Sequence, residues 1–171
     1  MVPVKKIFYL TGVFVLAMLT EVSAQSGLDS IQLKTVKSKM VSYGSLTAKA
    51  PIVLVCFWSV NSDVSIQEVN AINVQYGKWK QPAPFVLLAI CIDEGNLLNR
   101  MRPTASQNDW AFDVYADFNG DLQKSLHFTN PPQAFILEKG QVVYQQSGFE
   151  PGTEDYLFSR IRSLANPPLP R

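Results

Sequence analysis

The chain has 171 residues, of which 47% are hydrophobic and 17% charged, with 15 basic side chains, 14 acidic side chains and one histidine. This length suits one globular domain with a sizeable core. A formal net charge of +1 lacks the basic excess that electrostatic nucleic-acid binders carry. Two cysteines and one histidine are too few for the usual zinc sites or for a disulfide-dense scaffold. We therefore expect no metal, no other cofactor and no nucleic-acid partner.

Residues 1–24 have the features of a secretory signal peptide. Lys5 and Lys6 precede an apolar run over 7–19, and 22–24 has small residues suited to cleavage before Gln25. A helix of this run would rise about 20 Å, less than the roughly 30 Å core of a bilayer. The alternatives are an uncleaved anchor and a buried N-terminal helix. Cleavage predicts a periplasmic or extracellular protein without net charge or a membrane span.

The remaining chain divides into a domain over 25–166 and a proline-rich tail over 167–171 that cannot be helical. Within the domain, 31–41 predicts a short hairpin or an extended entry. The apolar runs at 51–58 and 85–92 are typical of parallel strands that are buried on both faces. The domain therefore contains a parallel pair of strands at its centre.

A helix is predicted between these two strands. Apolar side chains recur at Ile66, Val69, Ile72 and Tyr76, which predicts an amphipathic helix and a right-handed βαβ unit. A weaker helix is expected over 96–102, ending at or near Pro103.

The last third of the domain predicts a turn, a hairpin and a helix. The turn lies at 117–120 and the closing hairpin pairs 134–137 with 141–144. Thr153 is expected to cap a final helix whose buried face carries Leu157, Ile161 and Leu164. This order predicts an α/β thioredoxin fold, with a central mixed sheet flanked by helices and an N-terminal β-hairpin extension.

Four segments carry a resemblance to a known family: 53–58, 110–114, 117–121 and 132–137. They resemble the secreted bacterial thiol–disulfide oxidoreductases of the TlpA/ResA type, within the AhpC/TSA redoxins, and the resemblance covers roughly residues 30 to 165. In that family the first strand ends in the pattern Phe-Trp-Ala-x-Trp-Cys-x-Pro-Cys-x-x-Glu. Residues 57–68 align with this pattern without a gap.

Both cysteines of the pattern are replaced by serine, at Ser62 and Ser65, and its proline is replaced by Val64. A Cys-x-x-Cys pair works because the helix N-terminus stabilises the first thiolate and the second sulfur resolves the mixed disulfide. Serine hydroxyls cannot undergo this two-electron exchange. We therefore expect a binding or scaffold role, with an envelope protein or an extended peptide as the partner. The candidate binding residues are Trp58, Asn61, Ser62, Asp63, Ser65, Pro131 and Pro132.

The same residues have a purely structural interpretation at a helix start. Ser62 can cap the helix, Asp63 complements its dipole, and Ser65 with Glu68 has the spacing of a capping box. The resemblance implies that Glu68 would tune the thiols. Without thiols, capping is the simpler role.

The resemblance also implies a cis peptide bond at Pro132, which would face the serine loop. In the family the preceding residue offers its N–H and C=O to an extended substrate. Pro131 has no N–H, so one of these bonds is unavailable. A rigid strand entry is therefore favoured over a retained peptide clamp.

An enzymatic alternative stays open: a thiol–disulfide oxidoreductase or peroxidase-like enzyme of the redoxin type that uses Cys56 and Cys91. Both lie in apolar strands, where a free cysteine behaves as an inert hydrophobic residue. A structural disulfide between them is a further alternative. His127, the one histidine, has no sequence neighbour that would make it a base, and 117–121 fits a turn better than a calcium loop.

Overall fold

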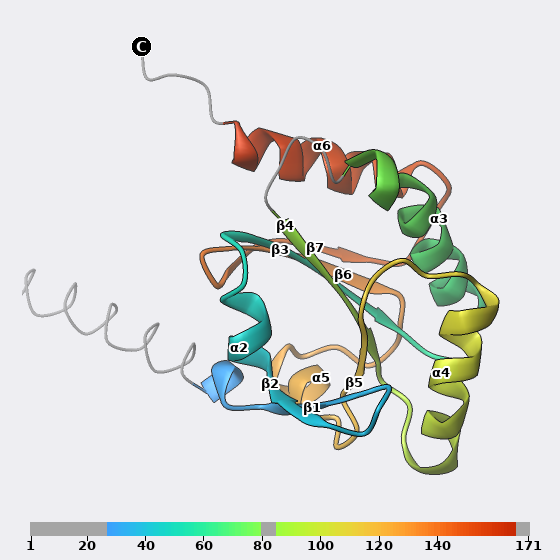
Figure 1. The fold of residues 1–171 in the computed structure, drawn as a ribbon. Coiled ribbons are helices and arrows are strands. Elements are labelled where there is room, and N and C mark those ends of the chain that lie inside the picture. The colour runs from blue at the N-terminus through green and yellow to red at the C-terminus, as the bar shows by residue number, and fades with distance from the viewer. Residues whose placement is uncertain (1–26, 80–84, 167–171) are drawn as a thin grey trace, which may run out of the picture.

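The computed structural model describes residues 27–79 and 85–166, so the predicted signal peptide and tail lie outside the described residues. One seven-stranded mixed sheet, in the order β2-β1-β5-β4-β3-β6-β7, carries helices on both faces (Figure 1). The strands are β1 Gln32–Thr35, β2 Met40–Ser42, β3 Ile52–Trp58, β4 Phe85–Cys91, β5 Val114–Ala116, β6 Gln133–Glu138 and β7 Gln141–Ser147. The helices are α2 Tyr43–Thr47, α3 Asp63–Trp79, η1 Gly95–Leu97, α4 Leu98–Gln107, α5 Asp121–Ser125 and α6 Thr153–Ala165.

The centre of the sheet is the predicted parallel pair. β3 pairs with β4 from Ile52 opposite Phe85 to Trp58 opposite Cys91, and α3 connects the two strands. Every residue of β3 is buried, as expected for a strand covered on both faces. On its other side β3 pairs antiparallel with β6. The predicted βαβ unit and mixed sheet are thus confirmed.

Both predicted hairpins are present. β1 and β2 pair antiparallel, and β1 joins the sheet by pairing with β5. β6 and β7 form the closing hairpin through Lys139 and Gly140, whose φ angles are 51° and 84°. Positive φ at both central residues gives the turn a twist that matches the flanking strands.

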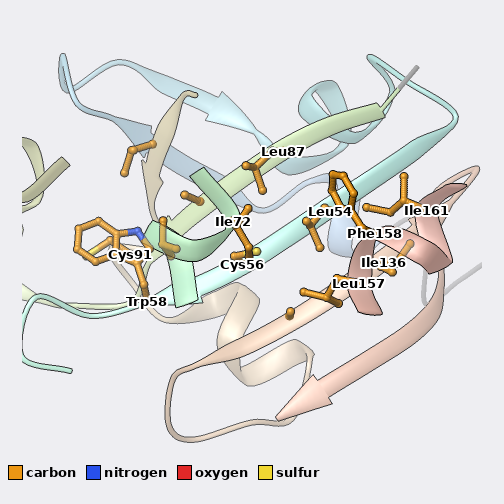
Figure 2. Close-up of a cluster of buried hydrophobic side chains, with 14 of the residues drawn as sticks. Leu54, Cys56, Trp58, Ile72, Leu87, Cys91, Ile136, Leu157, Phe158 and Ile161 are labelled. Carbon is orange, nitrogen blue, oxygen red and sulfur yellow. The ribbon is translucent and has the colours of Figure 1, made fainter. Parts of the chain in front are cut away.

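Two hydrophobic clusters cover the two faces of the sheet because alternate residues of β3 point to opposite sides. Leu54, Cys56 and Trp58 pack beneath α3 and α6 (Figure 2). Val53, Val55 and Phe57 pack on the other face, against residues of α2 and α5. None of the described helices is both long and apolar enough to span a membrane.

The helix expected to end near Pro103 is longer than predicted. α4 continues through Pro103 to Gln107. Proline removes the N–H that would bond the carbonyl of Asn99. Asn99 is exposed, so water can satisfy that carbonyl, and the loss does not end the helix.

The start of α6 also differs from the prediction. Gly152, with φ of 99°, takes the cap position, and Thr153 is the first helical residue. The Thr153 hydroxyl instead donates to the carbonyl of Glu150 and accepts from its N–H. The predicted face is confirmed, since Leu157 and Ile161 are buried and Leu164 packs against the same cluster.

Candidate functional site

The candidate site lies at the carboxyl ends of the central parallel strands. β3 ends at Trp58, a four-residue loop follows, and α3 begins at Asp63. Asp93 comes two residues after the end of β4. In parallel α/β sheets this edge is where loops gather and ligands bind. We call the segment 59–62 the serine loop.

Ser62 caps α3 as predicted from the sequence. Its Oγ accepts a hydrogen bond from the backbone N–H of Ser65 at 3.3 Å. Asp63 supplies an acidic side chain in the first turn, where the helix dipole favours negative charge. The two residues therefore stabilise the start of the helix.

Ser65 occupies the second sulfur position of the resembled pattern and is completely buried. Its Oγ accepts the backbone N–H of Ser59 at 3.1 Å and donates to the carbonyl of Ser62 at 2.8 Å. Both hydrogen-bonding roles of the hydroxyl are thus used inside the protein. Ser65 connects the serine loop to α3 and is not available to an external ligand.

Asp93 anchors the serine loop from the neighbouring strand, and the sequence analysis missed it. Its carboxylate accepts the Ser59 hydroxyl and the Val60 N–H, both at 2.7 Å. It also accepts the thiol of Cys91 at 3.1 Å. One feature of the sequence could have identified it: Asp93 directly follows the second apolar run. Adjacent parallel strands end at the same edge of the sheet, so a residue there lies near the end of the first strand. Asp93 is 7% exposed, so these bonds stabilise a buried carboxylate.

Glu68 does not cap the helix, and the capping-box prediction is wrong. Its side chain is completely buried, and neither carboxylate oxygen has a hydrogen-bond partner among the described residues. Burial raises the pKa of Glu68 from 4.5 to about 8. Glu68, six residues after the cap residue Ser62, is buried in the core, where the indole Nε1 of Trp58 also lacks a described partner.

The two thiols lie in the core and form no disulfide. Cys56 is 1% exposed and Cys91 is 0% exposed. Burial raises the pKa of both thiols; Glu68 adds to the effect at Cys56, and the hydrogen bond to Asp93 adds to it at Cys91. Neither thiol lies at a helix N-terminus, the position that stabilises a thiolate. Both are therefore held in the protonated form.

The peptide bond between Pro131 and Pro132 is cis, as the resemblance implied. Gln133 pairs with Phe57, so the register places Pro132 beside the end of β3, where the serine loop begins. Pro132 is buried and its carbonyl accepts the N–H of Gly148 at 3.0 Å. Pro131 is half-buried.

The structure divides the predicted binding residues into two groups. Trp58, Ser65 and Pro132 are buried, so they support the surface without forming it. The accessible members are Asn61, Ser62, Asp63 and Pro131. We call these four residues together with Val64 the site surface.

Two further residues belong to this region although the sequence analysis did not name them as binding residues. Val64 is an apolar residue in the first turn of α3 and is 46% exposed. Arg100 of α4 donates from Nη1 to Oδ1 of Asn61 at 3.2 Å. The site surface thus combines polar, acidic and apolar groups.

His127 and Asp117, which the sequence also offered as candidates, do not belong to the site surface. His127 is exposed on the loop after α5. The carboxylate of Asp117 accepts the N–H groups of Leu122 and Gln123, so it stabilises the start of α5 as a turn residue. Within the described part of the chain, no group of three His, Cys, Asp or Glu residues is arranged to hold a metal ion.

Comparison with known proteins finds similar structures. No family model matches the chain, and no curated protein matches it. An uncharacterised thioredoxin-like protein from Porphyromonas gingivalis has a TM-score of 0.71 and 29% identity, covering 81% of this chain and 91% of its own.

Two further solved structures have lower identity. A putative thiol:disulfide interchange protein DsbE from Chlorobium tepidum has a TM-score of 0.68 and 20% identity, covering 79% and 92%. The bacterioferritin comigratory protein of Xanthomonas campestris, with alkyl peroxide reduction activity, has a TM-score of 0.70 and 15% identity, covering 82% and 96%. The chain therefore has the thioredoxin-like α/β fold and is similar to the thioredoxin-like redoxins.

Proposed function

We propose that this protein is a thioredoxin-fold protein of the bacterial envelope that has lost thiol–disulfide exchange and binds a protein or an extended peptide. The observation that carries the proposal is the state of the serine pair. The Ser65 hydroxyl is saturated by the backbone of the serine loop, and Ser62 caps α3. At the two positions where the resembled enzymes have reactive cysteines, this chain has one serine that caps α3 and one that holds the loop backbone.

The buried thiols support the loss of redox chemistry. Disulfide exchange needs an accessible thiolate to attack a disulfide sulfur. Cys56 and Cys91 are buried in the two central strands, and burial favours their protonated form. An oxidoreductase or peroxidase-like enzyme using these two thiols would have to expose the centre of the sheet. The enzymatic alternative is therefore disfavoured.

The site surface supports a binding role. Val64 presents an apolar side chain, and Asn61 and Asp63 present polar and acidic groups beside it. Apolar contacts surrounded by polar groups are the general make-up of a protein interface, and Val64 with its polar neighbours offers both on a small scale. Because Pro131 has no N–H, a bound peptide would have to depend more on side-chain contacts than on a backbone clamp.

An envelope location fits the predicted signal peptide and the similar proteins. One similar structure is a secreted disulfide oxidoreductase from Mycobacterium tuberculosis, with a TM-score of 0.61. The predicted cleavage before Gln25 would release residues 25–171 into the same kind of compartment.

Insulin reduction tests the loss of redox chemistry. The mature chain is assayed beside a Ser62→Cys/Ser65→Cys variant and beside Ser62→Cys alone, which lacks the resolving thiol. We expect the natural chain and the single variant to be inactive and the double variant to be active. Reduction of insulin by the natural chain would overturn the proposal and make Cys56 and Cys91 the catalytic candidates.

Photo-crosslinking tests the binding role separately. A photoreactive amino acid is placed at position 64 and, as the matched control, at position 74, where Val74 is 66% exposed elsewhere on α3. A discrete cross-linked partner in the envelope at position 64 and none at position 74 is the expected result. Identical cross-linking from both positions would contradict a role for the site surface.

A further inference from the structure

A cleft lies between the turn that joins β1 to β2 and helix α4. Its volume of about 440 Å³ is within the range of roughly 300 to 1,000 Å³ that small-molecule sites occupy. One wall includes Lys34, Val36 and Ser38, and the other includes Leu98 and Arg102 of α4. We call this space the β1–α4 cleft. None of the site-surface residues lines it, so it is separate from the site surface.

The floor of the β1–α4 cleft is apolar. Ala116 of β5 and Met101 of α4 line the cleft and are 1% and 5% exposed, and both belong to the hydrophobic cluster on this face of the sheet. Val36 and Leu98 are half-buried and pack against the same cluster. An apolar chain that entered the cleft would therefore be removed from water against an apolar surface, which favours binding.

The turn that forms one wall is held in a fixed shape by Thr35. Its Oγ1 accepts the backbone N–H groups of Lys37 at 3.3 Å and of Lys39 at 3.1 Å. Its backbone N–H donates to the carbonyl of Lys39, and its carbonyl accepts the N–H of Ser38, both at 2.9 Å. Because these bonds exist without a ligand, binding would not have to order this wall.

The residues that line the cleft include two basic side chains and no acidic one. Arg102 is exposed, and Lys34 is half-buried with its Nζ 4.6 Å from the centre of the Phe118 ring. Asp109 and Asp113 line an adjoining cleft that also includes Arg102, but within residues 27–79 and 85–166 neither forms an ion pair with it. Both cations are therefore available to an anionic group of a ligand.

The cations at the cleft are a local excess in a chain of nearly balanced charge. The whole chain has 15 basic and 14 acidic side chains, whereas the segments 34–39 and 95–102 together carry five basic side chains and no acidic one. These segments are far apart in the sequence, and the fold brings them together at the cleft. Clustered charge of one sign raises the local concentration of ligands of the opposite sign.

We propose that the β1–α4 cleft binds a small organic acid with a carboxylate at one end and an apolar chain at the other. The guanidinium of Arg102 presents N–H donors in the planar arrangement that matches a carboxylate, and Lys34 adds a second positive charge. The apolar chain packs on the floor formed by Met101 and Ala116. The need for both parts distinguishes this site from a basic surface that attracts any anion.

NMR titration of the ¹⁵N-labelled mature chain with octanoate tests the proposal. Octanol has the same chain without the charge, and acetate has the charge without the chain. We expect octanoate to cause saturable shifts at the Val36, Met101 and Ala116 amides. A solvent-accessible ion pair contributes about 2- to 5-fold in affinity, so octanol, which loses two, should bind about 4- to 25-fold more weakly. Acetate should bind at least about 10-fold more weakly because it has no chain to bury.

Variants test the two cations. Arg102→Gln and Lys34→Gln should each weaken octanoate binding about 2- to 5-fold. Arg162→Gln and Lys78→Gln, at exposed positions outside the cleft, are the matched controls and should leave it unchanged.

Three results would overturn the proposal: equal binding of octanoate and octanol, an absence of saturable shifts in the cleft, or shifts confined to another surface of the protein. The comparison of ligands uses the natural chain, so it does not depend on how well the variants fold.

Discussion

The hydroxyl of Ser65 accepts the backbone N–H of Ser59 at 3.1 Å, across the turn that joins β3 to α3. The same oxygen donates to the Ser62 carbonyl at 2.8 Å. A residue in the position of a sulfur atom thus holds the serine loop against the helix. This contact explains how the loop keeps its form without a disulfide, and it makes the loop's stability testable.

Replacing Ser65 with alanine should destabilise the protein by about 1–3 kcal/mol. The change leaves the Ser59 N–H without its acceptor, and an unsatisfied buried donor costs its desolvation free energy. Urea unfolding measures the difference. Ser106→Ala on α4, where the side chain is exposed, should change the free energy of unfolding by less than about 0.5 kcal/mol. Equal effects of the two substitutions would refute the structural role of Ser65.

Replacing Asp93 with asparagine should loosen the serine loop. The carboxylate accepts three hydrogen bonds, from Ser59, Val60 and Cys91, and an amide nitrogen cannot accept. We expect a loss of about 1–3 kcal/mol and faster hydrogen exchange of the Val60 amide. Asp109→Asn is the matched control because Asp109 is exposed and has φ of 50°, a conformation that asparagine tolerates. Unchanged exchange at Val60 in Asp93→Asn would contradict the anchoring role.

Glu68 should make stability depend on pH. Its pKa is raised by burial from 4.5 to about 8 in the folded protein. Well below pH 4.5 the Glu68 carboxyl is protonated in both the folded and the unfolded protein, so folding does not bury a charge there. As pH rises toward 8 the unfolded state loses its proton first, and this contribution to the free energy of unfolding falls by on the order of 3–5 kcal/mol.

Glu68→Gln tests this dependence because glutamine has the same shape without the proton equilibrium. The variant should lose most of the fall in stability between pH 5 and pH 9 measured by urea unfolding. Glu150→Gln, at an exposed position, should retain the natural profile. A pH profile that is the same in Glu68→Gln and in the natural protein would show that Glu68 is not the titrating group.

Both cysteines should resist thiol reagents in the folded protein. Cys56 and Cys91 are buried, and burial raises the pKa of each thiol, which lowers the thiolate fraction that reacts. Titration with a chromogenic disulfide should detect almost no reaction under native conditions and two thiols after unfolding in guanidinium chloride. Rapid native labelling of either thiol would contradict the buried arrangement and favour the enzymatic alternative.

Predictions from the sequence were correct where a single local pattern specifies the structure. The continuous apolar runs predicted β3 and β4, because a short run that is apolar at every position is typical of a strand covered on both faces. Ser62 and Asp63 were predicted as helix-start residues from their chemistry alone. The helix through Pro103 was missed because a local rule cannot tell whether the affected carbonyl is exposed to water.

Glu68 and Asp93 show what the sequence left undecided. Ser65 and Glu68 have capping-box spacing, but α3 turns the Glu68 side chain toward the sheet, so burial replaces capping. Asp93 and the serine loop are about thirty residues apart in the sequence, and only the parallel register of β3 and β4 brings them together.

The sequence by itself determined the parallel strand pair, the closing hairpin and the absence of sulfur at the start of α3, because residue type and local periodicity carry that information. Only the tertiary structure decided which site residues are accessible and which carboxylates are buried. These properties depend on packing between distant segments, which no local pattern records.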